Sequence, residues 1–204
     1  QGIDVLDADG DGREDLLLRH AEGLSVVSRD AAGTWRLIWE HAAIADAALA
    51  VLEDPARGPS LIFTDLDQDN AGLWRAAPGP GRQGFVALAP SGRSAGADGM
   101  RSNASGIGTE IRLRRGAHWS IGHLLDRGSG AGQSLQPIAF GVGDAGQADF
   151  IELQWSDGVM QTELALAAAE LHRIEETQRQ LASCPVLFAW DGQRYRFVSD
   201  LLGV

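Results

Sequence analysis

The sequence predicts an all-β protein. Apolar and polar residues alternate in several short stretches, as they do along half-buried strands, and residues 107–113 are a clear case. Glycine occurs 26 times in 204 residues, and clusters of glycine, proline and serine separate the strand-like stretches. Two Asp-Gly pairs, at 157–158 and 191–192, lie between such stretches, and each predicts the turn of a β-hairpin.

Strands flank two acidic loops in the first part of the chain. Ile3 and Val5 alternate with polar residues ahead of the first loop, and the leucines at 16–18 follow it. Three apolar residues at 61–63 lead into the second loop as a buried strand would. Both loops are therefore expected to connect strands.

Strands also account for the middle of the chain. We expect residues 84–88 to form the last strand of the first region, followed by a Ser/Gly/Ala-rich linker at 91–102. Beyond the linker, the alternating residues 107–113 are expected to form a half-buried strand. Residues 140–144 and 150–158 are further strand and turn units.

The last quarter of the chain mixes strands with one predicted helical segment. Residues 159–162 are expected to return from the 157–158 turn as a strand. Residues 164–170 could form one or two helical turns, because alanine and leucine favour helix. A closing strand at 172–175 follows, and residues 183–198 are predicted to fold as a hairpin.

Residues 7–15 carry the strongest chemical signal. Carboxylates occupy positions 1, 3, 5 and 9 of this loop, and glycines at positions 4 and 6 permit the tight coiling that lets alternate side chains converge. Ca²⁺ accepts roughly six to eight oxygen ligands in flexible arrangements. A solvated acidic turn is the alternative, but carboxylates this dense repel one another without a cation. The predicted ligands are Asp7, Asp9, Asp11 and Asp15, with the main-chain carbonyl of Arg13.

A second acidic loop begins 58 residues later and is less complete. Three carboxylates keep their spacing, and Asn70 replaces a glycine while tolerating left-handed backbone. Leu73 stands where the fourth carboxylate would be. The sequence leaves open whether this loop holds metal. Its candidate ligands are Asp65, Asp67, Asp69 and the carbonyl of Ala71.

The first loop lacks the glutamate that an EF-hand requires at position 12, where this chain has Leu18. It resembles instead the Asp-x-Asp-x-Asp-Gly-x-x-Asp loops of the FG-GAP/VCBS family of propeller repeats. The resemblance implies Ca²⁺ bound between two strands of a blade, and two partial blades within residues 1–90. A propeller needs at least about four blades to close, so we expect the chain to be part of a longer protein. The residues that carry the resemblance are Asp7, Asp9, Asp11, Gly12 and Asp15.

Residues 103–177 resemble the ASPIC/UnbV domain, which follows FG-GAP repeats in cartilage acidic protein and in many bacterial exported proteins. One departure is the glycine-rich run at 126–132, where an aromatic residue usually lies. The resemblance implies a small β-sandwich-like domain, and residues 178–204 are similar to the start of a further β-rich region. The matching residues are Asn103, 106–108, 133–134, 140–143, 150–153, Trp155, 157–158 and 161–162.

Composition excludes several classes of partner. The formal charge of −11 argues against nucleic acid, which needs basic patches, and against anionic membrane surfaces. No run of about 18 apolar residues exists, so direct membrane insertion is not expected. The single cysteine, Cys184, excludes an internal disulfide.

No catalytic constellation stands out. His118 and His123 are five residues apart, which places them on opposite faces of a strand. Cys184 has no histidine nearby in sequence, and no Gly-x-Ser-x-Gly elbow occurs. Two interpretations stay open for three arginines, a solvated strand face and a site for an acidic ligand. These are Arg112, Arg114 and Arg115.

These observations and resemblances together lead to one functional expectation and one alternative. We expect a non-enzymatic, calcium-binding adhesion or scaffold module, secreted, periplasmic or on the cell surface, that presents a surface to a protein or glycan partner. Ca²⁺ is the one expected cofactor. The alternative is an accessory or catalytic domain of an exported or biosynthetic enzyme system of the enediyne type, which the UnbV name suggests.

Overall fold

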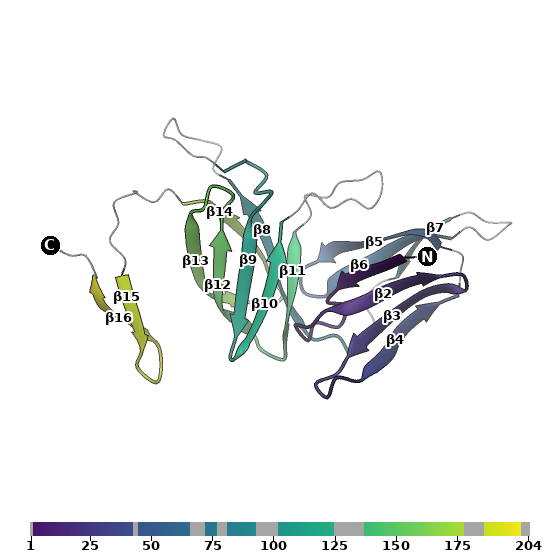
Figure 1. The fold of residues 1–204 in the computed structure, drawn as a ribbon, viewed down its shortest axis with the longest axis horizontal. Helices are drawn as coiled ribbons and strands as arrows, with labels where there is room; N and C mark the ends of the chain where they lie inside the picture. The colour runs from purple at the N-terminus through teal and green to yellow at the C-terminus, as the bar shows by residue number, and fades with distance from the viewer. Residues whose placement is uncertain are drawn as a thin grey trace.

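The computed structural model describes residues 2–42, 45–65, 72–76, 81–92, 102–124, 137–177 and 186–200. Within these residues the chain forms sixteen strands and no helix (Figure 1), so the prediction of an all-β fold is confirmed. Consequently, no helix in the described part of the chain is long and apolar enough to span a membrane.

The first four strands form an antiparallel sheet in which each strand pairs with the next. Leu17, Leu24 and Val26 alternate with more exposed residues along these strands and point into a core. The pairing of Leu6 with Asp15 closes the first hairpin around the predicted acidic loop. The strands are β1 (Gly2–Leu6), β2 (Asp15–His20), β3 (Gly23–Arg29) and β4 (Trp35–His41).

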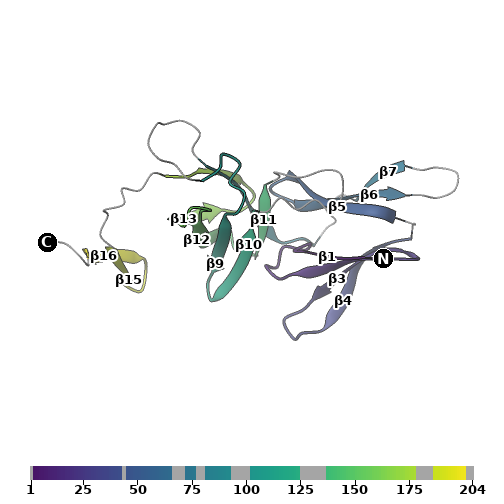
Figure 2. The ribbon, with the colours of Figure 1, turned by 45° about the horizontal axis from the view of Figure 1, so that its top comes forward.

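A three-stranded antiparallel sheet covers the inner face of the first one. Figure 2 shows these two sheets as two layers. Leu61 and Phe63 of the second sheet join Leu17, Leu24 and Val26 in one buried cluster. The strands of the second sheet are β5 (Ala45–Asp54), β6 (Gly58–Asp65) and β7 (Gly72–Ala76).

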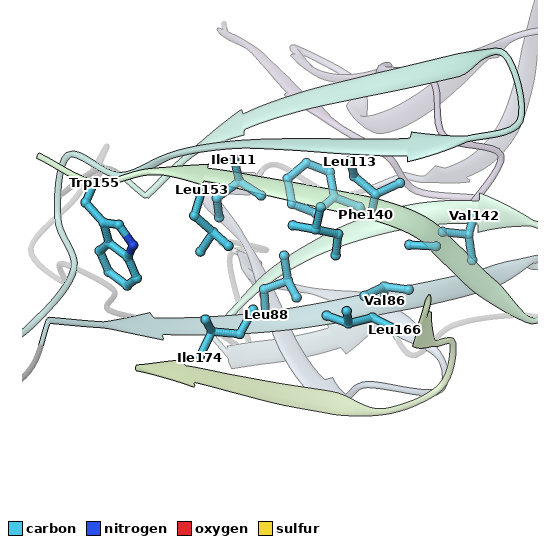
Figure 3. Packing of buried hydrophobic residues seen from close by; sticks show 12 residues of the cluster. Val86, Leu88, Ile111, Leu113, Phe140, Val142, Leu153, Trp155, Leu166 and Ile174 are labelled. Atoms are coloured by element: carbon cyan, nitrogen blue, oxygen red, sulfur yellow. The ribbon is translucent and has the colours of Figure 1, made fainter. Parts of the chain in front are cut away.

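Two further sheets form a sandwich in the middle of the molecule, where Ile111 and Leu113 of one sheet face Val86 and Leu88 of the other (Figure 3). Trp155 closes one end of this core, and its indole Nε1 donates a hydrogen bond to Gln161 Oε1 at 3.1 Å. One sheet has the order β11-β8-β14, with β11 (Ile138–Gly143), β8 (Gly84–Ser91) and β14 (Leu171–Glu175). The other has the order β10-β9-β12-β13, with β10 (His118–His123), β9 (Glu110–Arg115), β12 (Gln147–Gln154) and β13 (Met160–Ala167).

Two sequence expectations are wrong. Residues 84–88 do not close the first region; they lie in β8, the central strand of the β11-β8-β14 sheet. An apolar run that is buried on both faces identifies a central strand but not its partners. Residues 164–170 form no helix, because residues up to Ala167 continue β13 beside β12 and a turn follows at 168–170. Pairing within the sheet overrides the helix propensity of alanine and leucine.

Both hairpin predictions are confirmed. The 157–158 turn joins β12 to β13, and the 191–192 turn joins β15 (Val186–Trp190) to β16 (Tyr195–Asp200). The β15–β16 hairpin lies to one side of the sandwich in both views (Figures 1 and 2). Its Tyr195 hydroxyl accepts a hydrogen bond from Arg114 Nη1 at 2.9 Å. Residues 93–101 of the expected linker and the 126–132 glycine run lie outside the described residues.

Candidate metal centre

The acidic loop is the turn of the β1–β2 hairpin. Its two ends are fixed because Leu6 pairs with Asp15 in the strand ladder. Between them the backbone coils through Gly10 and Gly12, which have φ angles of +83° and +84°. Residues other than glycine rarely adopt that left-handed backbone conformation, so these two glycines allow the loop to fold back on itself.

Three of the predicted ligands converge inside this loop. Asp7, Asp9 and Asp15 each offer a carboxylate oxygen within 4.8 Å of the other two. Asp15 is fully buried, and its Oδ2 accepts a hydrogen bond from the Ala8 amide at 2.8 Å. Its Oδ1 is buried too and has no hydrogen-bond partner among the described residues. A buried carboxylate oxygen without a donor is unfavourable unless a cation or water satisfies it.

Backbone amides hold the carboxylate of Asp7. Its Oδ1 accepts from the Gly10 amide at 2.7 Å, and its Oδ2 accepts from the Gly12 amide at 2.9 Å and from the Gly141 amide at 3.0 Å. Gly141 belongs to β11, far away in sequence. The loop is therefore anchored both to itself and to the sandwich.

Asp9 is held in a different way. Its Oδ1 accepts from the Asp11 amide at 3.1 Å, and its Oδ2 accepts from the Ser28 hydroxyl at 3.0 Å. Ser28 is a buried polar residue of β3, so the neighbouring strand supplies the second anchor. This arrangement keeps the Asp9 carboxylate turned toward the cluster.

Burial in the loop disfavours the ionised form of Asp7 and Asp15. Burial raises the pKa of Asp7 to about 7, and the charges of Asp15 and Asp9 act in the same direction, whereas the Gly10 and Gly12 amides oppose the shift. Burial is also the main cause that raises the pKa of Asp15; the Ser28 hydroxyl and the Ala8 amide oppose this, and the Asp9 charge adds to it. A bound cation would stabilise the ionised form of these carboxyl groups and offset the cost of burying their charge.

Asp11 and Arg13, the other two predicted ligand residues, pair with each other. Asp11 Oδ1 accepts from the Arg13 amide at 2.8 Å, and its Oδ2 lies 2.9 Å from Arg13 Nη1. The Arg13 side chain is substantially exposed, and exposed ion pairs contribute only about 0–1 kcal/mol.

A second arginine near the loop, Arg82, donates to the Pro59 carbonyl at 2.6 Å. Burial lowers the pKa of Arg82, while the charges of Asp7 and Asp9 oppose this.

The second acidic loop can be placed only at its start. Asp65 is the last residue of β6, and its side chain is not described. Asp67, Asp69 and Ala71 lie outside the described residues.

Three other residues singled out in the sequence have partners within the structure, and Cys184 lies outside the described residues. The Nε2 atom of His118 lies 2.9 Å from the Gly12 carbonyl, and that of His123 lies 3.2 Å from Glu110 Oε2. Arg112 pairs with Glu110 at 2.6 Å and with Glu152 at 3.1 Å. These contacts favour structural roles for the two histidines and for Arg112.

Sequence reasoning missed the contribution of the sandwich to the loop. Gly141 and His118 lie more than a hundred residues from the loop, and no local pattern signals such contacts. Ser28 could have been suspected, since it is a polar residue at an inward-facing position of β3, where Leu24 and Val26 are the other inward-facing residues.

One comparison identifies part of the chain. A family model described as ASPIC and UnbV matches residues 99–181, which include β9 to β14. An ASPIC/UnbV domain is therefore present, as the sequence resemblance implied. No curated protein matches the chain. The acidic loop and the first two sheets lie outside the matched residues.

Proposed function

We propose, taking the ASPIC/UnbV domain at residues 99–181 as the premise, that the chain is a non-enzymatic calcium-binding module of an exported protein. In this proposal it is secreted, periplasmic or on the cell surface, and it presents a surface to a protein or glycan partner. One observation carries the metal-binding part: three carboxylates converge within 4.8 Å, and the buried Asp15 among them has an oxygen without a partner.

The donor set fits a hard divalent cation. Every side-chain donor at the site is a carboxylate oxygen, which suits Ca²⁺ and Mg²⁺ better than a metal that prefers nitrogen or sulfur. The loop also contains carbonyls and is built on glycines, which suits the more flexible coordination of Ca²⁺. When bound, the cation would supply positive charge that offsets the mutual repulsion of the carboxylates. Asp7, Asp9 and Asp15 would hold it.

Asp11 and the Arg13 carbonyl complete the proposed ligand set. Asp11 is engaged by Arg13 through an ion pair with an exposed arginine, and such a pair is weak enough to exchange for a cation. The equivalent set in the second loop, Asp65, Asp67, Asp69 and the Ala71 carbonyl, is proposed as a weaker site because Leu73 stands in place of the fourth carboxylate.

The first two sheets are proposed to be partial propeller blades of the FG-GAP/VCBS type. The antiparallel meander of β1 to β4 has the strand order of a single blade, and the β5-β6-β7 sheet packs face to face against it. Trp39 and Phe63 meet across the two layers with ring centroids 6.1 Å apart. Aromatic packing of this kind suits the contact between neighbouring blades.

A groove beside the acidic loop is the proposed surface for a partner. It has a volume of about 630 Å³ and runs between the loop, β10 and β11. Trp119 and Ile121 of β10 line it and are 48% and 59% exposed, next to the polar residues Arg13 and Glu14. Exposed apolar side chains bordered by charges are typical of surfaces that bind proteins or sugars.

No reaction is proposed for the chain. Asp7 and Asp15 are carboxyl groups with a raised pKa, and both belong to the acidic loop. A metal-binding role accounts for these two shifts without a catalytic acid or base.

The experiment is a thermal unfolding series with and without Ca²⁺. We expect Ca²⁺ to raise the melting temperature of the chain and to lose this effect in Asp9→Asn, which removes one ligand charge. Glu22→Gln removes an exposed charge from the β2–β3 turn and is the matched control. An equal Ca²⁺ effect in all three proteins would contradict binding at the acidic loop.

A further inference from the structure

We infer that the acidic loop is also the joint between the first unit, which comprises the β1–β4 and β5–β7 sheets, and the ASPIC/UnbV domain. Metal binding at the loop then fixes these two units to each other. The inference rests on the proposed Ca²⁺ site. Groups of the sandwich would then position the loop for the metal.

Three backbone amides outside the loop donate to loop oxygens. Gly143 donates to the Gly10 carbonyl at 2.8 Å, and Gln83 donates to the Asp9 carbonyl at 2.7 Å. Gly141 donates directly to Oδ2 of Asp7, one of the three clustered carboxylates, at 3.0 Å. Gly141 and Gly143 lie in β11, and Gln83 immediately precedes β8.

Side chains of β9 and β10 contact the same loop. The Gly12 carbonyl accepts a hydrogen bond from His118 Nε2 at 2.9 Å and another from the Ser120 hydroxyl at 3.2 Å. Arg115 Nη2 lies 3.5 Å from the Asp11 carbonyl. In Figure 1 the turn between β1 and β2 lies beside β10 and β11. None of these three side chains is a proposed ligand, and each contacts the loop through a main-chain carbonyl.

The close approach also explains a glycine in β11. A Cβ atom on Gly141 would lie 2.0 Å from Asp7 Oδ2 and 2.5 Å from the carbonyl carbon of Gly10. No side chain can occupy that space unless the loop and β11 separate. By contrast, a Cβ atom on Gly146, in the turn after β11, would meet nothing within 4 Å.

Metal binding and docking are therefore linked. The coil that brings Asp7, Asp9 and Asp15 together is the same coil that directs the Gly10 and Gly12 carbonyls at donors of the sandwich. If Ca²⁺ favours the docked joint by a given free energy, the docked joint favours Ca²⁺ binding by the same free energy. Without a cation, repulsion among the carboxylates works against both.

The first test is amide hydrogen exchange on the full chain. We expect Ca²⁺ to slow exchange of the Gly141 and Gly143 amides at least about tenfold, which lies within the usual range of coupling between sites. The Gly158 amide, which donates to the Trp155 carbonyl in the distant 157–158 turn, is the internal control and should not change. Saturable Ca²⁺ binding with unchanged exchange at Gly141 and Gly143 would overturn the inference and leave the metal site standing.

The second test uses variants that keep every proposed ligand in the sequence. His118→Ala combined with Ser120→Ala removes two donors from the Gly12 carbonyl and touches neither β11 nor a carboxylate of the cluster, so it is the decisive variant. It should weaken Ca²⁺ binding by about tenfold. Gly141→Ala should also weaken binding, but its Cβ would meet Asp7 Oδ2 itself, whereas Gly146→Ala should not change binding. Normal affinity in the His118/Ser120 double variant would overturn the inference. No Ca²⁺ binding to the unmodified chain would remove the proposed function and the inference together.

Discussion

At the scale of single residues, the chemistry of the loop centres on Asp15. Its side chain is fully buried at the start of β2, with one oxygen bound to the Ala8 amide and the other lacking a partner among the described residues. The charges of Asp9 and Asp11 add to the effect of burial in raising its pKa. A buried acid of this kind destabilises the metal-free fold and stabilises the metal-bound one.

Asp15→Asn should separate these two effects. The amide oxygen can keep the bond to Ala8, and the new NH₂ group can donate to the neighbouring carboxylates where Asp15 has an unpartnered oxygen. We expect the variant to melt at a higher temperature than the native chain in a chelator, and to lose the stabilisation by Ca²⁺. Thermal unfolding in both conditions measures this. A lower melting temperature in chelator together with normal Ca²⁺ stabilisation would contradict the assignment.

Ca²⁺ binding should depend on pH through Asp7. Its pKa of about 7 lies above the ordinary value of 3.8, so the metal-free fold binds this proton more tightly than the unfolded chain does, and its stability falls as pH rises across that window. Metal ligands must be deprotonated, so the apparent Ca²⁺ affinity should fall by about tenfold for each pH unit below 7. Calorimetric titration between pH 5.5 and 8 checks this, and a constant affinity over that range would contradict it.

Much of the site could be predicted at this scale, because the spacing of Asp7, Asp9 and Asp15 on either side of two glycines encodes a converging loop. The pairing of Asp11 with Arg13 could not be predicted, because an exposed ion pair contributes only about 0–1 kcal/mol and sequence spacing does not select one such pair over another. The bond from the Gly141 amide to Asp7 depends on how two distant segments pack, and no sequence pattern reports that.

At the scale of elements, the first unit is held together by the contact between its two sheets. Phe63 of β6 is 3% exposed, and its ring meets those of Trp39 and His41 with centroids 6.1 and 4.8 Å apart. The alternation along β6 places Phe63 inward in the strand that leads into the second acidic loop. Packing of these rings therefore holds β6 against the first sheet.

Phe63→Ala should lower the free energy of unfolding by about 3 kcal/mol or more, because it leaves a cavity between two sheets that cannot close over it. Leu73→Ala in β7 is the matched control, since Leu73 is 75% exposed and its change should stay within about 0.5 kcal/mol. Denaturant unfolding measures both values. Similar small effects of the two substitutions would show that the sheets do not pack as described.

Strand positions were predicted better than strand partners. Alternation and turn residues placed β12 and both Asp-Gly hairpins, and most of β9, which begins at Glu110 rather than at residue 107, because each signal is local. The partners of β8 are β11 and β14, more than 45 residues away, and its apolar run fits any buried sheet equally well. The predicted helix at 164–170 failed for a related reason, since the partner strand β12 decides its conformation.

At the scale of the whole molecule, two separately packed units meet at a loop that carries concentrated negative charge. The chain has a formal charge of −11, and Asp7, Asp9 and Asp15 place part of it at the joint. The two hydrophobic cores are distinct, one between the first two sheets and the other inside the sandwich. The units meet at the loop and also at Phe85 of β8, whose buried ring lies against Gly58 of β6, so cooperation between them can pass through both contacts.

Calorimetric unfolding should report that cooperation. With Ca²⁺ bound we expect the two units to melt in one transition, because separating them would expose the metal loop; in chelator we expect two transitions. Gly141→Ala should show two transitions in both conditions, and Gly146→Ala should behave like the native chain. Two well-separated transitions for the native chain in saturating Ca²⁺ would contradict a metal-linked joint.

A crystal structure of the chain grown with Ca²⁺, with anomalous scattering recorded to locate the ion, would show directly whether the loop holds metal. We expect an anomalous peak within coordination distance of the Asp7, Asp9 and Asp15 carboxylates, with the Gly141 amide still donating to Asp7. A loop with carboxylates turned apart and no peak, in a chain saturated with Ca²⁺, would contradict it.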